Sequence, residues 1–200
     1  MEHHFYWVRI GDVPQWLIET PEPASGGAFD EPWMFSDGRV LPEPGPIKAL
    51  ISHPGEKRTF VFAGVESTPT VNEAVANVFR TIAPTDVQIF PVLIEGESER
   101  YFVINVTKVV DCIDEARCQE VQHYAEDDPF PEYEGEYRWI YGLRIDPSKT
   151  EGAQVFRLMK FKTAFIVSED IKNALERVGN LGVSFERVTG PQEPPLSRCL

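Results

Sequence analysis

The sequence predicts an α+β fold, in which a mostly antiparallel sheet carries two principal helices. Two segments have the apolar periodicity and the capping residues of amphipathic helices, and each is followed by a tight turn and a strand. The other apolar segments are short and bounded by turn residues, which is typical of strands. We therefore expect an α+β domain at residues 59–190, preceded by an arm at 1–58 and followed by a tail at 191–200.

The arm at residues 1–58 is expected to be long and irregular, with short strands, and to pack on the core. The segment 5–10, FYWVRI, has strand character, but between Pro14 and Pro46 the chain is rich in Pro and Gly. Proline removes backbone donors and disfavours helix, so little regular structure is expected there. Large apolar side chains are expected to hold the arm on the core, with a binding role as the alternative: Trp16, Phe29, Trp33, Met34 and Phe35.

The first helix is expected to begin at a capping box formed by Thr70 and Glu73. A Thr hydroxyl can accept from the amide three residues on, while the Glu side chain reaches back to the first amide. Pro84 ends the helix, because proline cannot continue the hydrogen-bond pattern. One face of this helix is apolar: Val71, Ala74, Val75, Val78, Phe79 and Ile82.

The second helix is expected to begin after Ser168, whose hydroxyl can cap it, and to end at Gly179. Two acidic residues lie in its first turn, where the helix dipole favours negative charge. Laying residues 71–92 on 167–188 without a gap superposes the apolar faces of both helices, as a duplicated helix–strand unit would. Any two such units share part of this pattern, so chance similarity is the alternative.

Strands are expected along the rest of the chain, and the turn-like GESE joins two of them into a hairpin, 86–95 with 100–110. Residues 111–136 are polar and are expected to be irregular. The remaining strand segments are 47–52, 59–64, 137–145, 154–159, 163–167 and 183–188.

The charge balance restricts the partners that the protein can have. The 200 residues include 32 acidic and 19 basic side chains, a formal net charge of −13, which would repel nucleic-acid backbones and anionic membranes. A basic partner, or none, is therefore favoured. The N-terminus lacks the features of a signal peptide, and no apolar run approaches the roughly 18 residues of a membrane helix, so we expect a cytoplasmic protein.

The stretch VVDCIDEARC, residues 109–118, contains two cysteines and is followed by His123, but its spacing does not fit the sites that it suggests. Zinc sites use cysteine pairs with about two to four residues between them, and redox pairs use C-x-x-C. Acidic neighbours of Cys112 oppose the thiolate that a nucleophile needs. We expect no metal, cofactor or catalytic residue, and a buried Cys112 at the end of a strand; an enzyme using Cys112 and His123 is an alternative.

Acidic residues are concentrated between Asp111 and Glu136, where ten of them accompany one basic residue, Arg117. Aromatic residues alternate with them in the later part of this segment. Acids attract a basic surface over a distance, and aromatic rings supply contact area at an interface. We predict a binding loop, with a solvated loop whose rings pack on the core as the alternative: Glu126, Asp127, Asp128, Phe130, Glu132, Tyr133, Glu134 and Glu136.

Four segments carry a resemblance to a known family: YFVINVTKVVDCID, YGLRIDPSK, VFRL and AFIVSEDIKNALERVGNLGVSFERV. In their order and amino-acid sequence they resemble the bacterial immunity proteins of polymorphic-toxin systems, specifically immunity protein family eleven. The resemblance covers roughly residues 59–190, and the part before about residue 58 contributes little. The segment MKFKTAF, residues 159–165, is more basic than the family pattern, and the insert at 120–136 is particular to this chain.

The resemblance implies a cytoplasmic protein that binds one cognate toxin domain, often a basic nuclease, and blocks it. It supplies no catalytic residues. The leading hypothesis is thus a toxin-neutralising protein whose basic partner meets the acidic and aromatic loop. The alternatives are a non-catalytic adaptor or structural protein with another partner, and the enzyme named above.

Overall fold

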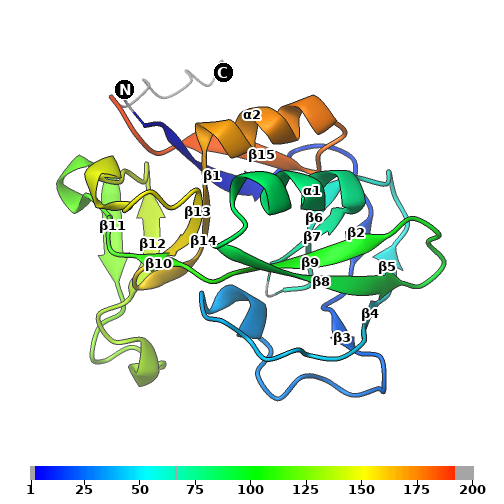
Figure 1. Cartoon of the computed structure of the whole chain (residues 1–200). Helices are drawn as coiled ribbons and strands as arrows, with labels where there is room; N and C mark the ends of the chain where they lie inside the picture. Colours follow the sequence, from blue (N-terminus) through cyan, green and yellow to red (C-terminus); the bar gives the residue numbers. More distant parts are fainter. Residues whose placement is uncertain (1–2, 66, 192–200) are drawn as a thin grey trace, which may run out of the picture.

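The α+β class predicted from the sequence is confirmed by the computed structural model, which describes residues 3–65 and 67–191 (Figure 1). The two helices are α1 (Glu73–Ile82) and α2 (Glu169–Val178). The strands are β1 (Phe5–Ile10), β2 (Leu17–Ile18), β3 (Glu22–Pro23), β4 (Ile47–Ala49), β5 (Ile51–His53), β6 (Phe60–Ala63), β7 (Thr68–Asn72), β8 (Val87–Ile94), β9 (Tyr101–Val106), β10 (Val109–Val110), β11 (Glu120–His123), β12 (Tyr137–Tyr141), β13 (Val155–Leu158), β14 (Phe161–Ser168) and β15 (Val183–Arg187).

Most strands belong to two mixed sheets. A six-stranded sheet has the order β3-β4-β8-β9-β7-β6, and a five-stranded sheet has the order β10-β13-β14-β1-β15. Neighbouring strands are antiparallel except for the parallel pairs β4–β8 and β10–β13. Two further pairs, β2–β5 and β11–β12, form small separate sheets. None of the described helices is long and apolar enough to cross a membrane.

Each large sheet contains the same strand–helix–strand unit. In one, α1 joins β7 to β8, and β9 lies between these two strands antiparallel to both. In the other, α2 joins β14 to β15, and β1 lies between them in the same way. The gapless overlay of 71–92 on 167–188 places the α1 cap on the α2 cap and each helix on the other. This repeated topology is what an internal duplication would produce.

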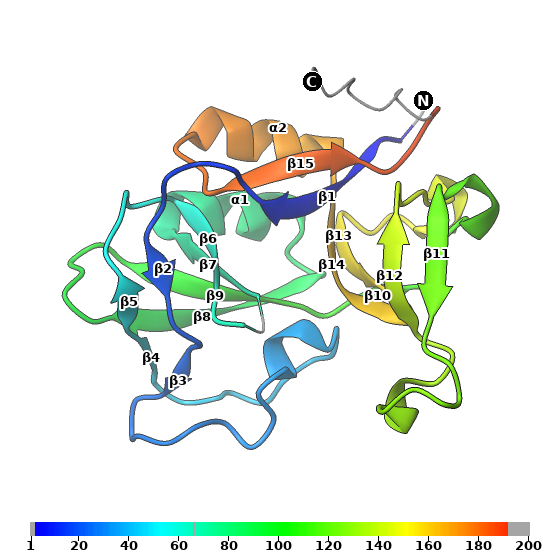
Figure 2. The same cartoon turned by 180° about the vertical axis from the view of Figure 1, so that it is seen from behind.

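The two helices pack side by side, and the largest core cluster lies between them and the inner faces of both sheets (Figures 1 and 2). At its centre the ring of Phe165 from β14 lies 6.1 Å from those of Phe60 in β6 and Phe79 in α1, measured between centroids. All three side chains are fully buried. Aromatic contacts therefore join elements of both units.

The predicted cap of the second helix is confirmed, whereas that of the first is wrong. Ser168 accepts a hydrogen bond from the amide of Ile171, and Gly179 ends α2 with a φ of 73°. In contrast, Asn72 and not Thr70 caps α1, accepting from the Val75 amide at 3.1 Å. Thr70 and the neighbouring Val71 are buried in β7, which pairs with β6 and β9. Because β7 pairs with a strand on each of its edges, Thr70 is held in the sheet and does not cap the helix.

Three segments differ from the prediction. Two of them are each split into two strands, and the third contains a strand where none was expected. The segment 47–52 separates into β4, which pairs with β8, and β5, which pairs with β2. The segment 100–110 separates into β9 and β10, which belong to different large sheets. The segment 111–136, expected to be irregular, contains β11. Only one of the four β11 residues is apolar, so no alternation marked it as a strand.

Candidate protein-binding surface

The predicted binding residues lie on one loop, residues 124–136, between β11 and β12. This loop projects from the body of the molecule at the end of the hairpin (Figures 1 and 2). Its base continues the hairpin, because the amide of Tyr124 donates to the carbonyl of Glu136 at 3.0 Å. A short 3₁₀ helix, Pro131–Tyr133, turns the chain, with proline at the position where a missing amide costs least.

Four of the predicted acids are exposed and form no ion pair with any residue in 3–65 or 67–191: Glu126, Asp127, Glu132 and Glu134. Asp128 has a different environment. One of its carboxylate oxygens accepts from the Ala125 amide at 2.7 Å, and the other lies 3.0 Å from an Arg138 guanidinium nitrogen. Asp128 therefore shapes the loop, while the four unpaired acids face solvent.

The aromatic rings of the loop pack on one another and remain partly exposed. The rings of Tyr124 and Tyr133 are 5.4 Å apart, and those of Phe130 and Tyr133 are 6.4 Å apart. Phe130 and Tyr133 keep 51% and 39% of their surface exposed. The Arg138 guanidinium lies over Tyr124 at 5.8 Å. This arrangement holds apolar surface next to the unpaired acids.

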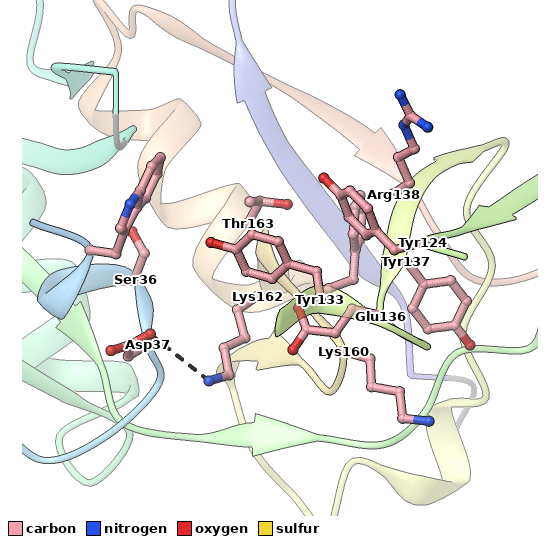
Figure 3. Close-up of a pocket in the computed structure, with 12 residues that line it drawn as sticks. Ser36, Asp37, Tyr124, Tyr133, Glu136, Tyr137, Arg138, Lys160, Lys162 and Thr163 are labelled. Carbon is pink, nitrogen blue, oxygen red and sulfur yellow. Dashed lines mark ion pairs between the residues drawn. The ribbon is translucent and has the colours of Figure 1, made fainter. Parts of the chain in front are cut away.

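A groove of about 370 Å³ separates this loop from the N-terminal arm (Figure 3). The loop contributes Tyr133 and Glu136 to one wall, and the arm contributes Trp33 and Asp37 to the other. The start of β14 and the preceding residue complete the lining with Lys160, Phe161, Lys162 and Thr163. The sequence did not place the arm and β14 beside the loop.

The arm residues differ in their burial. Trp16 and Phe35 are 4% and 2% exposed and belong to a core cluster of the six-stranded sheet. Phe29 and Met34 pack against the same cluster. Trp33, which precedes the 3₁₀ helix Met34–Ser36, is 47% exposed at the groove. Most of these side chains therefore hold the arm on the core, and Trp33 is available to a partner.

Burial raises the thiol pKa of both cysteines that the structure describes, Cys112 and Cys118. Cys112 is fully buried in the cluster that contains Phe156 and Leu158. Burial, and to a smaller extent the negative charge of Asp111, raises the pKa of its thiol to about 12. His123, the base considered for Cys112, contacts Glu115, 3.4 Å away, and the ring of Tyr137. Within the described residues, no group of three or more His, Cys, Asp or Glu side chains could hold a metal ion. Cys199 lies outside the described residues.

The environment of Cys112 predicts a slow thiol. In a protein carrying Cys118→Ser and Cys199→Ser, we expect Cys112 to react with Ellman's reagent at about pH 8 at least 100-fold more slowly than free cysteine. Neutral thiol dominates below the raised pKa, and the folded core excludes the reagent. Full reaction after unfolding in guanidinium is the control. Rapid labelling of the folded protein would contradict this placement of Cys112.

The chain matches a known protein family. A family model described as "Immunity protein family (Imm11)" matches residues 25–190. A search of curated proteins gives no match. The family resemblance predicted from the sequence is confirmed, but its expected start near residue 59 is wrong, because the match includes much of the arm. The arm is therefore part of what this chain shares with its family.

Proposed function

The chain belongs to the Imm11 immunity protein family, and from this premise we propose that it neutralises one cognate toxin domain with a basic surface, a nuclease, in the cytoplasm. The contact surface in this proposal is the loop at residues 124–136. Membership of an immunity family supports the neutralising role, and the chemistry of the loop supports the kind of toxin.

One observation carries the choice of surface. Four carboxylates without an ion pair among the described residues, those of Glu126, Asp127, Glu132 and Glu134, share a projecting loop with the exposed ring of Phe130. Charges of one sign that have no internal partner attract an oppositely charged surface and increase the association rate. An exposed aromatic side chain then supplies contact area that is removed from water on binding.

The net charge of −13 supports a nuclease as the toxin. A nuclease binds phosphates through lysine and arginine, so its active surface is basic. An acidic protein loop can occupy that surface in place of the nucleic acid. Binding of this kind weakens as salt increases, because the Debye length is about 8 Å at physiological ionic strength and shortens further above it.

Neutralisation is tested by co-expressing the protein with the toxin domain encoded by the adjacent gene. We expect cells to survive induction of the toxin only when the protein is present, and the two purified proteins to form a complex. A catalytically inactive toxin provides the control for expression burden. Death of the cells despite folded protein, together with no complex at low salt, would contradict the proposed function.

A further inference from the structure

Resting on the proposed function, we propose that the groove between the arm and the loop receives one arginine side chain of the toxin. Glu136 is the counter-charge for its guanidinium, and Trp33 and Tyr133 are the rings against which it packs. The arm is thereby part of the binding surface, and the toxin contacts two segments that are distant in sequence.

The rings at the groove suit a guanidinium group. Trp33 comes from the arm and Tyr133 from the loop, and both line the groove with much of their surface exposed. A guanidinium is planar, weakly hydrated and stacks on aromatic faces, whereas its methylene stem packs on apolar surface. The volume of about 370 Å³ is large enough for one long side chain and too small for a folded element.

The ion pairs already present leave one acid and one base in the lining. Asp37 lies 3.9 Å from the Lys162 ammonium and 3.6 Å from Arg39, and Arg138 pairs with Asp128 at 3.0 Å. Glu136 and Lys160 form no ion pair with any residue that the structure describes. The unpaired carboxylate of Glu136 is half-buried beside the tyrosines of the loop.

Of the three bases in the lining, Arg138 and Lys162 are held in ion pairs, so the preference for a cation depends on Glu136 and on the acids near it in the loop. Lys160 extends away from the Glu136 carboxylate, as Figure 3 shows, so it does not neutralise that acid. Glu132 and Glu134 are close in sequence to Glu136, are exposed and are unpaired within the described residues. Their potential adds to that of Glu136 and attracts positive charge to this loop, which forms part of the groove.

The test measures the affinity of the inactive adjacent-gene toxin for matched variants by calorimetry. We expect Glu136→Gln and Trp33→Ala each to weaken binding about tenfold or more, through loss of the counter-charge and of the cation–π contact. Glu120→Gln removes an equal charge from β11, outside the groove, and should change affinity by less than about threefold. Thermal unfolding of each variant verifies that it is folded.

Lys160→Met separates a cationic occupant from an anionic one. With an arginine in the groove, removal of the competing ammonium should strengthen binding about twofold or more. Weaker binding by Lys160→Met with no loss in Glu136→Gln would overturn the inference. So would equal effects of Glu136→Gln and Glu120→Gln. Both results leave the proposed function intact, whereas a wild-type protein that does not bind the toxin contradicts the proposed function itself.

Discussion

Replacing Phe165 with alanine is expected to lower the free energy of unfolding by about 3–5 kcal/mol, the usual cost of removing a fully buried phenylalanine side chain. Phe165 is completely buried, and its ring contacts those of Phe60, Phe62 and Phe79. Its loss leaves a cavity where β6, β14 and α1 meet, and these elements cannot all move inward to fill it. Denaturant unfolding measured by circular dichroism gives the value.

Phe130→Ala is the matched control, because it removes the same ring from an exposed position on the loop. Its free energy of unfolding should stay within about 0.5 kcal/mol of wild type. If Phe165→Ala were no more destabilising than Phe130→Ala, the two sheets would not share one core. If Phe130→Ala instead weakened toxin binding at unchanged stability, the loop would be supported as the contact surface.

Reversing three of the unpaired loop charges is expected to weaken toxin binding by about 100-fold or more, with much of the loss in the association rate. The variant carries Glu126→Lys, Asp127→Lys and Glu132→Lys, which leaves Asp128 in place because it shapes the loop. Each acid-to-lysine substitution changes the net charge by +2, so the formal net charge rises from −13 to −7. Stopped-flow association at several salt concentrations measures the effect.

The control variant makes the same change in net charge elsewhere, with Glu43→Lys, Glu95→Lys and Asp170→Lys. These three acids are exposed, belong neither to the loop nor to the lining of the groove, and Glu95 directly follows β8. We expect at most about a threefold loss of affinity, because solvent and salt screen exposed charges that do not contact the partner. Similar losses in both variants would show that net charge, and not the loop, determines binding.

The two helices show what a sequence can predict about this fold. The α2 boundaries follow from Ser168 and Gly179, because both act within one turn of the helix end. For α1 the Thr70 pattern failed, since Thr70 belongs to a strand whose partners are β6 and β9. A capping pattern is local, but strand pairing depends on segments that are far apart in sequence. Local preference therefore predicts a boundary only where no such pairing competes.

The candidate site shows the same limit. The acids and rings of the loop could be chosen from sequence, because they alternate within one short segment. Trp33 and Lys160 could not be chosen, since they meet the loop only after the arm and β14 have packed. Exposure of Trp33 among buried arm residues is a property of the folded chain. A sequence containing several aromatic arm residues gives no sign of which one remains exposed.

The position of β1 has a consequence for synthesis of the protein. Phe5 pairs with Ser168, and Tyr6 pairs with Arg187, so both neighbours of β1 are translated long after it. During translation, this strand must leave the ribosome with both of its edges unpaired until β14 and β15 emerge. Contacts between such distant segments form slowly, and unpaired strand edges associate with other chains. A chaperone that binds extended apolar segments would therefore have a target in β1, Phe5–Ile10, while the rest of the chain is being synthesised.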